Sequence, residues 1–207
     1  DGDADRCLLV ASNGEVIDGD YILNILATSW LEEGKLNKKT VVGTVMSNLG
    51  FIKSMESLGI KFEKTAVGDR YVLEKMLEND YTLGGEQSGH VIMRQFSNTG
   101  DGLLTALQVM QVVAKSKKSL LELATTMKKY PQILINIKNV KKERLASSEK
   151  INSAILLAEK ELGARGRVLV RASGTEALVR VMVEADDLNI AKSTADSLAQ
   201  LVKSELQ

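Results

Sequence analysis

The first two thirds of the chain alternate between short apolar runs and stretches in which apolar residues recur every three or four positions. The runs are typical of buried strands, and the three-to-four spacing is typical of helices. The pattern predicts strands at 7–11, 40–45 and 61–66, a helix that begins at Asp18 or Asp20 and ends at Gly34, and further helices at about 48–58, 69–78 and 120–127. Such alternation indicates a layered α/β domain, in which loops at the strand ends carry function.

The stretch 103–115 is too apolar for a helix at the surface. We therefore expect this helix to lie in the core, with five apolar side chains packed against neighbours: Leu104, Leu107, Val109, Met110 and Val113. A glycine-rich turn at 98–102 precedes the helix and supplies its cap.

The last third of the chain follows a different order of elements. We predict a strand at 132–138, a helix at 149–162, two strands on either side of the turn at 171–177, and a helix at 188–206. This β-α-β-β-α order makes a small sheet with helices on one side. The only proline, Pro131, lies just before the first of these strands, and we place the domain boundary there.

Composition excludes several classes of partner. The chain has 207 residues, 44% of them hydrophobic, which is enough for one large or two small cores. Lys plus Arg equals Asp plus Glu at 27 each, so no net charge attracts nucleic acid or an anionic membrane. No apolar run reaches the roughly 18 residues of a membrane helix, and the single Cys7 gives no disulfide framework. We expect a cytoplasmic protein. The sequence starts at Asp1, in the middle of a motif, so we also expect it to be a fragment.

The turn at 171–180 contains most kinds of phosphate ligand. Arg171 and Arg180 can each grip a phosphate with a planar fork of donors. Ser173 and Thr175 add hydroxyl groups, and Gly174 lets the backbone present its N–H groups to an anion. Valines alternate with Arg180 in the second strand, so Arg180 should face away from the core. The alternative is an ordinary hairpin whose loop carries two arginines.

The chain begins with three carboxylates at alternate positions, Asp1, Asp3 and Asp5. Such hard oxygen ligands suit Mg²⁺, which keeps open positions for water and phosphate oxygens. A calcium-binding EF-hand loop is excluded, because Arg6 and Ser12 stand where it needs glycine and glutamate. Arg6 could hold the carboxylates or touch a metal-bound phosphoryl group. The alternative is a solvated acidic turn.

A second polar loop lies between Gly85 and Val91. Glu86, Gln87, Ser88 and His90 offer acceptors and donors at close spacing, as binding of vicinal hydroxyl groups requires. His90 is the only histidine, and we interpret it as an orienting or packing residue. The alternative is a polar hairpin loop. In the same domain, Asp69 opens a helix and could serve only as its N-cap.

These three loops together resemble the motifs of the α-D-phosphohexomutase family, in the family's order and over the C-terminal half of its members. The metal-binding loop matches 1–6, the sugar-recognition loop 85–90 and the phosphate-binding loop 171–175. The resemblance implies a three-layer α/β domain followed by a smaller α+β domain of the TATA-box-binding-protein type. It divides the chain into the end of a preceding α/β domain (1–18), a sugar-binding domain (19–128) and a phosphate-binding domain (129–207).

The resemblance also implies an activity, that of an isomerase which moves a phosphoryl group within a sugar phosphate. The stretches 44–50 and 67–72 and the residue Gln87 resemble the branch that interconverts glucosamine 6-phosphate and glucosamine 1-phosphate. A phosphoserine on missing N-terminal domains would give its phosphoryl group to the sugar and form a sugar 1,6-bisphosphate intermediate. A sibling enzyme acting on glucose or mannose phosphates, or a non-catalytic phosphosugar-binding module, is the alternative.

Residue roles follow from the same resemblance. Mg²⁺ would bind to Asp1, Asp3 and Asp5, with Arg6 as support. Eight residues would bind the substrate: Glu86, Ser88, His90, Arg171, Ser173, Gly174, Thr175 and Arg180. Ala172 and Ala177 stand where the family usually has proline, which weakens the pre-organisation of the loop. We expect the fragment alone to be inactive, since no stretch matches the phosphoserine loop, and a homodimer is one option for the full-length enzyme.

Overall fold

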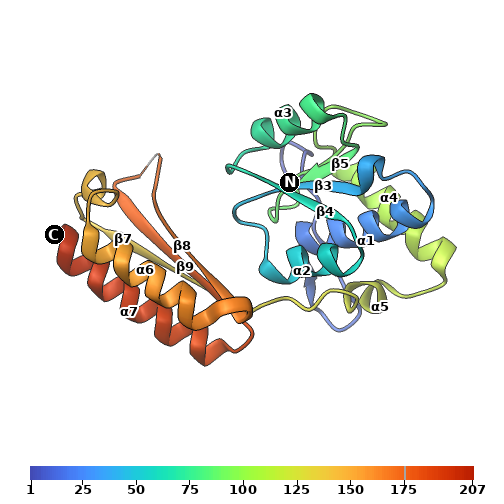
Figure 1. Ribbon diagram of the computed structural model, residues 1–207. Coiled ribbons are helices and arrows are strands. Elements are labelled where there is room, and N and C mark those ends of the chain that lie inside the picture. Colours follow the sequence, from blue (N-terminus) through green and yellow to red (C-terminus); the bar gives the residue numbers. More distant parts are fainter. Residues whose placement is uncertain (175) are drawn as a thin grey trace. The chain divides into compact units, whose positions relative to one another are not determined.

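The computed structural model describes residues 1–174 and 176–207, which form two compact units, Asp1–Lys129 and Tyr130–Gln207 (Figure 1). Each unit has a hydrophobic core of its own. Among the helices of the described ranges, none combines the length and the apolar character needed to cross a membrane. Thr175, which the sequence predicts to bind phosphate, lies outside the described residues.

A four-stranded sheet forms the centre of the first unit, in the order β4-β3-β5-β6. The strands are β3 (Thr40–Thr44), β4 (Lys61–Thr65), β5 (Leu83–Gly85) and β6 (Val91–Met93). Strand β3 runs parallel to β4 and β5, whereas β5 and β6 form an antiparallel hairpin. The sugar-recognition loop is the turn of that hairpin, so its polar residues lie at one end of the sheet.

Helices cover both faces of this sheet. Helices α1 (Gly19–Glu32) and α2 (Leu49–Ser57) pack on one face, and α3 (Asp69–Asn79) packs on the other (Figure 1). Two separate apolar clusters fill the spaces between the layers: Ile22, Leu26, Phe51 and Leu83 belong to the first, and Val42, Val72 and Met76 belong to the second. The three-layer α/β architecture predicted from the sequence is therefore confirmed.

Helix α1 lies at the centre of the first unit, where ten of its fourteen residues are buried. Asp18 is its N-cap and accepts hydrogen bonds from the backbone N–H groups of Asp20 and Tyr21. The helix ends just before Gly34, whose positive φ of 69° suits glycine. Around it pack α2, α4 (Gly102–Ser116), α5 (Leu120–Ala124) and the hairpin of β1 (Leu9–Val10) with β2 (Val16–Ile17).

The prediction that the helix at 103–115 is a core helix is only half right. Val109 is buried, and Leu104 and Val113 pack against the core from one side of α4. Leu107 and Met110 face the other way and are 52% and 54% exposed. The sequence predicts how apolar a helix is, but not which of its faces has a neighbour.

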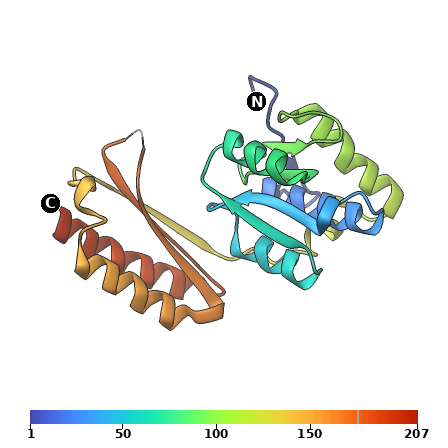
Figure 2. The ribbon, with the colours of Figure 1, turned by 45° about the horizontal axis from the view of Figure 1, so that its top comes forward.

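The second unit contains a three-stranded antiparallel sheet in the order β7-β9-β8. Its strands are β7 (Gln132–Lys138), β8 (Gly166–Ala172) and β9 (Leu178–Ala185), and its long helices are α6 (Glu149–Leu162) and α7 (Leu188–Leu206). Both helices lie on one face of the sheet (Figure 2), where Val179, Val181 and Val183 are fully buried. The predicted β-α-β-β-α order is confirmed.

Candidate functional site

The acidic loop at the start of the chain is held by an ion pair. Arg6 Nε donates a hydrogen bond of 2.5 Å to Asp1 Oδ2 and lies 3.8 Å from Asp5 Oδ1. Within the described part of the chain, no three His, Cys, Asp or Glu side chains converge on one point as metal ligands. Arg6 therefore pairs with Asp1 and lies near Asp5, and its support role stays a prediction.

One oxygen of this loop is nevertheless suited to a cation. Asp5 Oδ1 is buried and accepts no hydrogen bond from the described residues. A buried carboxylate oxygen without a donor is stabilised by a positive charge. Hard oxygen donors of this kind fit Mg²⁺. Beside the loop, burial raises the pKa of the Cys7 thiol, so Cys7 is a poor thiolate ligand.

The acidic loop is joined to the sugar-recognition loop through His90. The imidazole is buried, and its Nε2 lies 3.7 Å from Asp5 Oδ2 and 3.8 Å from Asp69 Oδ2. Arg6 and His90 form an antiparallel bridge, and Cys7 N–H donates to the Gly89 carbonyl at 3.0 Å. His90 is therefore buried between aspartates of two loops, and its role as an orienting or packing residue stays a prediction.

The glycine-rich turn at 98–102 closes on the same place. Gly102 N–H donates to the Ala4 carbonyl at 2.8 Å. A Cβ at Gly100 would overlap Nε2 of His90 and lie 2.7 Å from the Asp5 carbonyl oxygen. The turn was predicted only as a helix cap, and Asp101 does cap α4. It also packs the acidic loop against His90, and no sequence pattern indicated that contact.

Glu86 spans two loops of the first unit. Its Oε1 accepts a hydrogen bond of 3.0 Å from Gly68 N–H, at the start of α3, while Ser88 is exposed at the tip of the turn. The prediction that Asp69 caps α3 is wrong, because the N-cap is Gly68, which has φ 130° and no capping side chain. The Glu86 carboxylate satisfies one backbone N–H group at the start of this helix, that of Gly68.

Gly19 was not singled out from the sequence, yet it fixes the sugar-recognition loop on α1. Its N–H donates to the Gln87 carbonyl at 3.0 Å. A Cβ at this position would overlap the Glu86 carbonyl oxygen and lie 2.8 Å from the Gly89 nitrogen. The only signal in the sequence is a glycine directly after a capping aspartate, where helices do not otherwise require one.

In the second unit, the two arginines of the phosphate-binding loop stand directly opposite each other on β8 and β9. Both are half-buried, and Arg180 donates a 2.7 Å hydrogen bond to Glu176 Oε2. Arg180 Nε is buried and has no partner among the described residues. Like charges directly opposite on a sheet repel each other, so an anion between these guanidinium groups would stabilise the pair. Arg180 faces away from the valine-lined core, as predicted.

Ser173 and Gly174 take different positions from those that the sequence suggests. The Ser173 side chain is buried, and its Oγ accepts from Glu176 N–H at 3.3 Å, which holds the turn closed. Gly174 is exposed, and a Cβ there would meet nothing within 4 Å. The described conformation therefore does not require glycine at 174, and its assignment as a phosphate ligand stays a prediction.

Lys142 is a second residue that sequence reasoning missed. Its Nζ donates to the carbonyl oxygens of Ser173 at 2.7 Å and of Glu176 at 2.9 Å, which lie on either side of the turn tip. It comes from a short helical turn, η2 (Lys142–Arg144), which precedes the loop by about thirty residues in sequence. One ammonium group thus clamps the ends of the phosphate-binding turn.

Lys142→Met is expected to loosen this turn without unfolding the unit. Each lost hydrogen bond to the ammonium group contributes about 1.5 kcal/mol or more, so amide exchange at 173 and 176 should accelerate at least tenfold. Exchange measured by mass spectrometry checks this. Lys160→Met on the exposed side of α6 is the matched control, and equal exchange in the two variants would contradict the clamp.

Comparison with protein families gives two matches, which together cover most of the chain. Residues 18–130 match the family model described as "Phosphoglucomutase/phosphomannomutase, alpha/beta/alpha domain III". Residues 134–201 match the model described as "Phosphoglucomutase/phosphomannomutase, C-terminal domain". The first match alone spans more than half of the 207 residues.

Among curated proteins, the phosphoglucosamine mutase of Streptomyces griseus is 55% identical over 206 residues, which are 100% of this chain and 46% of that protein. The phosphoglucosamine mutase of Brevibacillus brevis is 52% identical with the same coverage. The chain therefore spans about half the length of these relatives.

Solved structures share the fold at lower identity. An N-acetylglucosamine-phosphate mutase in a product complex is 24% identical with a TM-score of 0.80, over 98% of this chain and 48% of that one. Aspergillus fumigatus N-acetylphosphoglucosamine mutase, in complex with GlcNAc-6P and magnesium, is 21% identical with a TM-score of 0.83, over 100% and 48%. A single-residue variant of that enzyme has also been solved in complex with glucose 1,6-bisphosphate.

Proposed function

This chain belongs to the phosphoglucomutase/phosphomannomutase family, and from that premise we propose that it is the C-terminal half of a phosphoglucosamine mutase. The full-length enzyme would interconvert glucosamine 6-phosphate and glucosamine 1-phosphate in the cytoplasm. The observation that carries the proposal is 55% identity over the whole chain to an enzyme of that name. The positions of Glu86 and Arg180 support it, because Glu86 uses only Oε1 for Gly68 and Arg180 Nε has no partner among the described residues.

The proposed reaction has two phosphoryl transfers. The phosphoserine of the upstream half gives its phosphoryl group to the free hydroxyl of the sugar phosphate, and a sugar 1,6-bisphosphate forms. The bisphosphate then reorients and returns its other phosphoryl group to the serine, so that neither phosphate nor water is consumed. Binding energy from the phosphate that does not react positions the reacting end.

Each unit of this chain has a separate task in the proposal. In the second unit, Arg171 and Arg180 hold the non-reacting phosphate by charge-assisted hydrogen bonds, with Ser173, Gly174 and Thr175 beside them. In the first unit, the carboxylate of Glu86 accepts from sugar hydroxyls, and Ser88 adds a hydroxyl group at the exposed tip. His90 orients Asp5 and Asp69.

Mg²⁺ is part of this proposal, since a relative of the same fold is described in complex with magnesium. Asp1, Asp3 and Asp5 would bind the ion, which offsets negative charge during phosphoryl transfer. For this to happen, Arg6 has to release Asp1. The freed guanidinium group is then available to the phosphoryl group that is transferred.

The test joins the upstream half of the Streptomyces griseus enzyme to Asp1 at the aligned position, which gives a full-length chimera. We expect the chimera to convert glucosamine 6-phosphate at least tenfold faster than glucose 6-phosphate or mannose 6-phosphate, and chain 1–207 alone to show no turnover. Preference for the glucose or mannose ester would identify a sibling mutase instead. Binding without turnover in a chimera that carries phosphoserine would identify a non-catalytic module.

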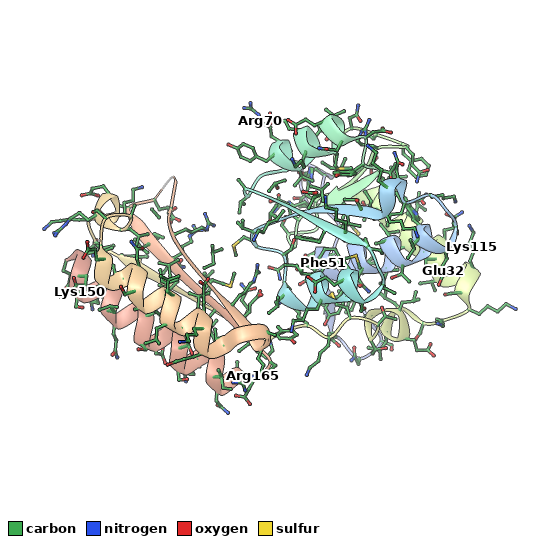
Figure 3. All side chains as sticks on the ribbon, in the orientation of Figure 1. Glu32, Phe51, Arg70, Lys115, Lys150 and Arg165 are labelled. Carbon is green, nitrogen blue, oxygen red and sulfur yellow. The ribbon has the colours of Figure 1, made fainter. Side chains whose placement is uncertain are left out.

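Glu86→Gln in the chimera is expected to lower kcat/KM for glucosamine 6-phosphate by about 10- to 100-fold, because a charge-assisted hydrogen bond is worth about 1.5–3 kcal/mol. The glutamine oxygen still accepts from Gly68 N–H, so the melting temperature should not change. Steady-state kinetics check this, with Glu32→Gln at the exposed end of α1 as the control (Figure 3). Equal kcat/KM values in the two variants would exclude Glu86 from the sugar site.

A further inference from the structure

The sheet of the second unit carries three cross-strand rows of side chains on the face opposite its helices. Strand β7 contributes Ile133, Ile135 and Ile137 to the core. Successive side chains of a strand point to opposite faces, so the residues between these isoleucines face away from the helices. In register, the rows on this face are Gln132–Glu184–Arg167, Leu134–Met182–Leu169 and Asn136–Arg180–Arg171.

The first row shows how this sheet neutralises an arginine. Arg167 Nε donates a hydrogen bond of 2.7 Å to Glu184 Oε2, and the Glu184 side chain is fully buried. A buried carboxylate is stable where a cation is bonded to it. This pair has no net charge, so the first row does not attract an anion.

The third row differs, because none of its strand residues is acidic. Arg180 pairs with Glu176 from the turn, whereas Arg171 forms no ion pair with the described residues. Two arginines and one glutamate leave one positive charge. Lys138, two residues after Asn136 on the same face, adds another. The third row therefore attracts an anion.

Asn136 is the uncharged member of the third row. It is exposed, and its side chain forms no hydrogen bond with the described residues. Residues directly opposite each other on antiparallel strands have Cβ atoms about 4.5–5.5 Å apart, so the carboxamide of Asn136 reaches the space beside the Arg180 guanidinium group. A carboxamide has two N–H donors. A third cation at this place would repel both arginines, whereas a neutral donor adds a hydrogen bond without that repulsion.

We propose that Asn136 is a further substrate-binding residue, which donates a side-chain hydrogen bond to the phosphate group held between Arg171 and Arg180. This inference rests on the proposed function, which places the non-reacting phosphate between these two arginines. The phosphate site then extends across all three strands of the sheet and is not confined to the turn between β8 and β9.

Asn136→Asp in the chimera tests this inference, because aspartate has the shape of asparagine but accepts where asparagine donates. We expect kcat/KM for glucosamine 6-phosphate to fall at least 100-fold, since the carboxylate repels the phosphate and pairs with Arg180. Asn136→Ala removes only the donor and should lower kcat/KM about tenfold. Gln132→Ala, an amide on the same strand and the same face, is the matched control and should stay within twofold of the parent.

The aspartate variant also separates donation to phosphate from a structural role. If Asn136 only accepted a hydrogen bond from Arg180, aspartate would strengthen that contact and preserve activity. A kcat/KM for Asn136→Asp equal to that of the parent, or a loss in Asn136→Ala that Asn136→Asp does not show, would therefore overturn the inference. The melting temperature of Asn136→Asp should equal or exceed that of the parent, because opposite charges directly across a sheet are stabilising.

Binding of inorganic phosphate to chain 1–207 gives a second reading, which does not depend on turnover. In an NMR titration, the dissociation constant should rise at least tenfold in Asn136→Asp and stay within twofold of the parent in Gln132→Ala. Equal dissociation constants for Asn136→Asp and the parent would overturn the inference. Weakened phosphate binding together with an inactive parent chimera contradicts only the proposed function, whereas an active chimera that Asn136→Asp leaves unchanged contradicts only this inference.

Discussion

Arg180→Ala in the full-length chimera is expected to lower kcat/KM for glucosamine 6-phosphate by about 100-fold or more. The substitution removes a forked donor that makes up to two charge-assisted hydrogen bonds to phosphate, each worth about 1.5–3 kcal/mol. Arg180 Nε is buried and has no partner in the described structure, so no protein acceptor there competes for this donor. Steady-state kinetics with glucosamine 6-phosphate measure the loss.

Matched variants separate phosphate binding from other effects of this change. Arg180→Lys keeps the charge but not the fork, so it should recover only part of the loss. Arg165→Ala removes an equal charge at the opposite end of β8 and should leave kcat/KM within twofold of the parent (Figure 3). Glu176→Gln breaks only the ion pair with Arg180. If Glu176→Gln reproduced the loss, Arg180 would act through the shape of the turn and not on the phosphate.

Gly19→Ala is expected to destabilise the first unit by about 3 kcal/mol, the upper part of the range for overpacking. Alanine is the better helix former by roughly 1 kcal/mol, but the added Cβ overlaps backbone atoms of the sugar-recognition loop, which cannot swing aside as a side chain can. The overlap therefore outweighs the helix propensity. In a domain of this size the melting temperature should fall by roughly 10 °C.

Thermal unfolding of chain 1–207 measures this shift, and the chimera measures its effect on turnover. Gly2→Ala is the control, because a Cβ at Gly2 meets nothing within 4 Å. We expect Gly2→Ala to leave the melting temperature unchanged. A melting temperature for Gly19→Ala equal to that of the control would mean that the loop can move away from α1 at no cost.

The sequence predicts helices and strands well wherever the local pattern of apolar and capping residues agrees with how the element packs in the fold. Helix α6 and strand β7 begin and end where apolar periodicity and capping residues place them, at Ser148 and near Pro131. The strand before the first turn was predicted at 7–11, and only Leu9–Val10 is paired. A strand's length depends on its partner strand as well as on its own residues.

The contacts that organise the loops were harder to predict. Lys142 reaches its turn from a distant segment, and the Gly19 contact depends on how closely two backbones approach. Neither has a periodic pattern, because both arise only when the tertiary fold brings separate segments together. Asp69 was misjudged for a related reason, since the Gly68 N–H is satisfied by Glu86 from another loop. The composition of a loop thus indicates which of its residues can bind a ligand. The residues that hold the loop in place can be recognised only in the structure.

The backbone bridge between Arg6 and His90 limits how this protein can be redesigned. Since the Cys7 N–H is bonded to the Gly89 carbonyl, inserting or deleting a residue between 86 and 89 would shift the acidic segment together with the hairpin turn. Substrate preference can therefore be varied by exchanging the side chains at 87 and 88, but not by changing the length of the loop. A library built for altered sugars should keep the length of this turn fixed and randomise only those two positions.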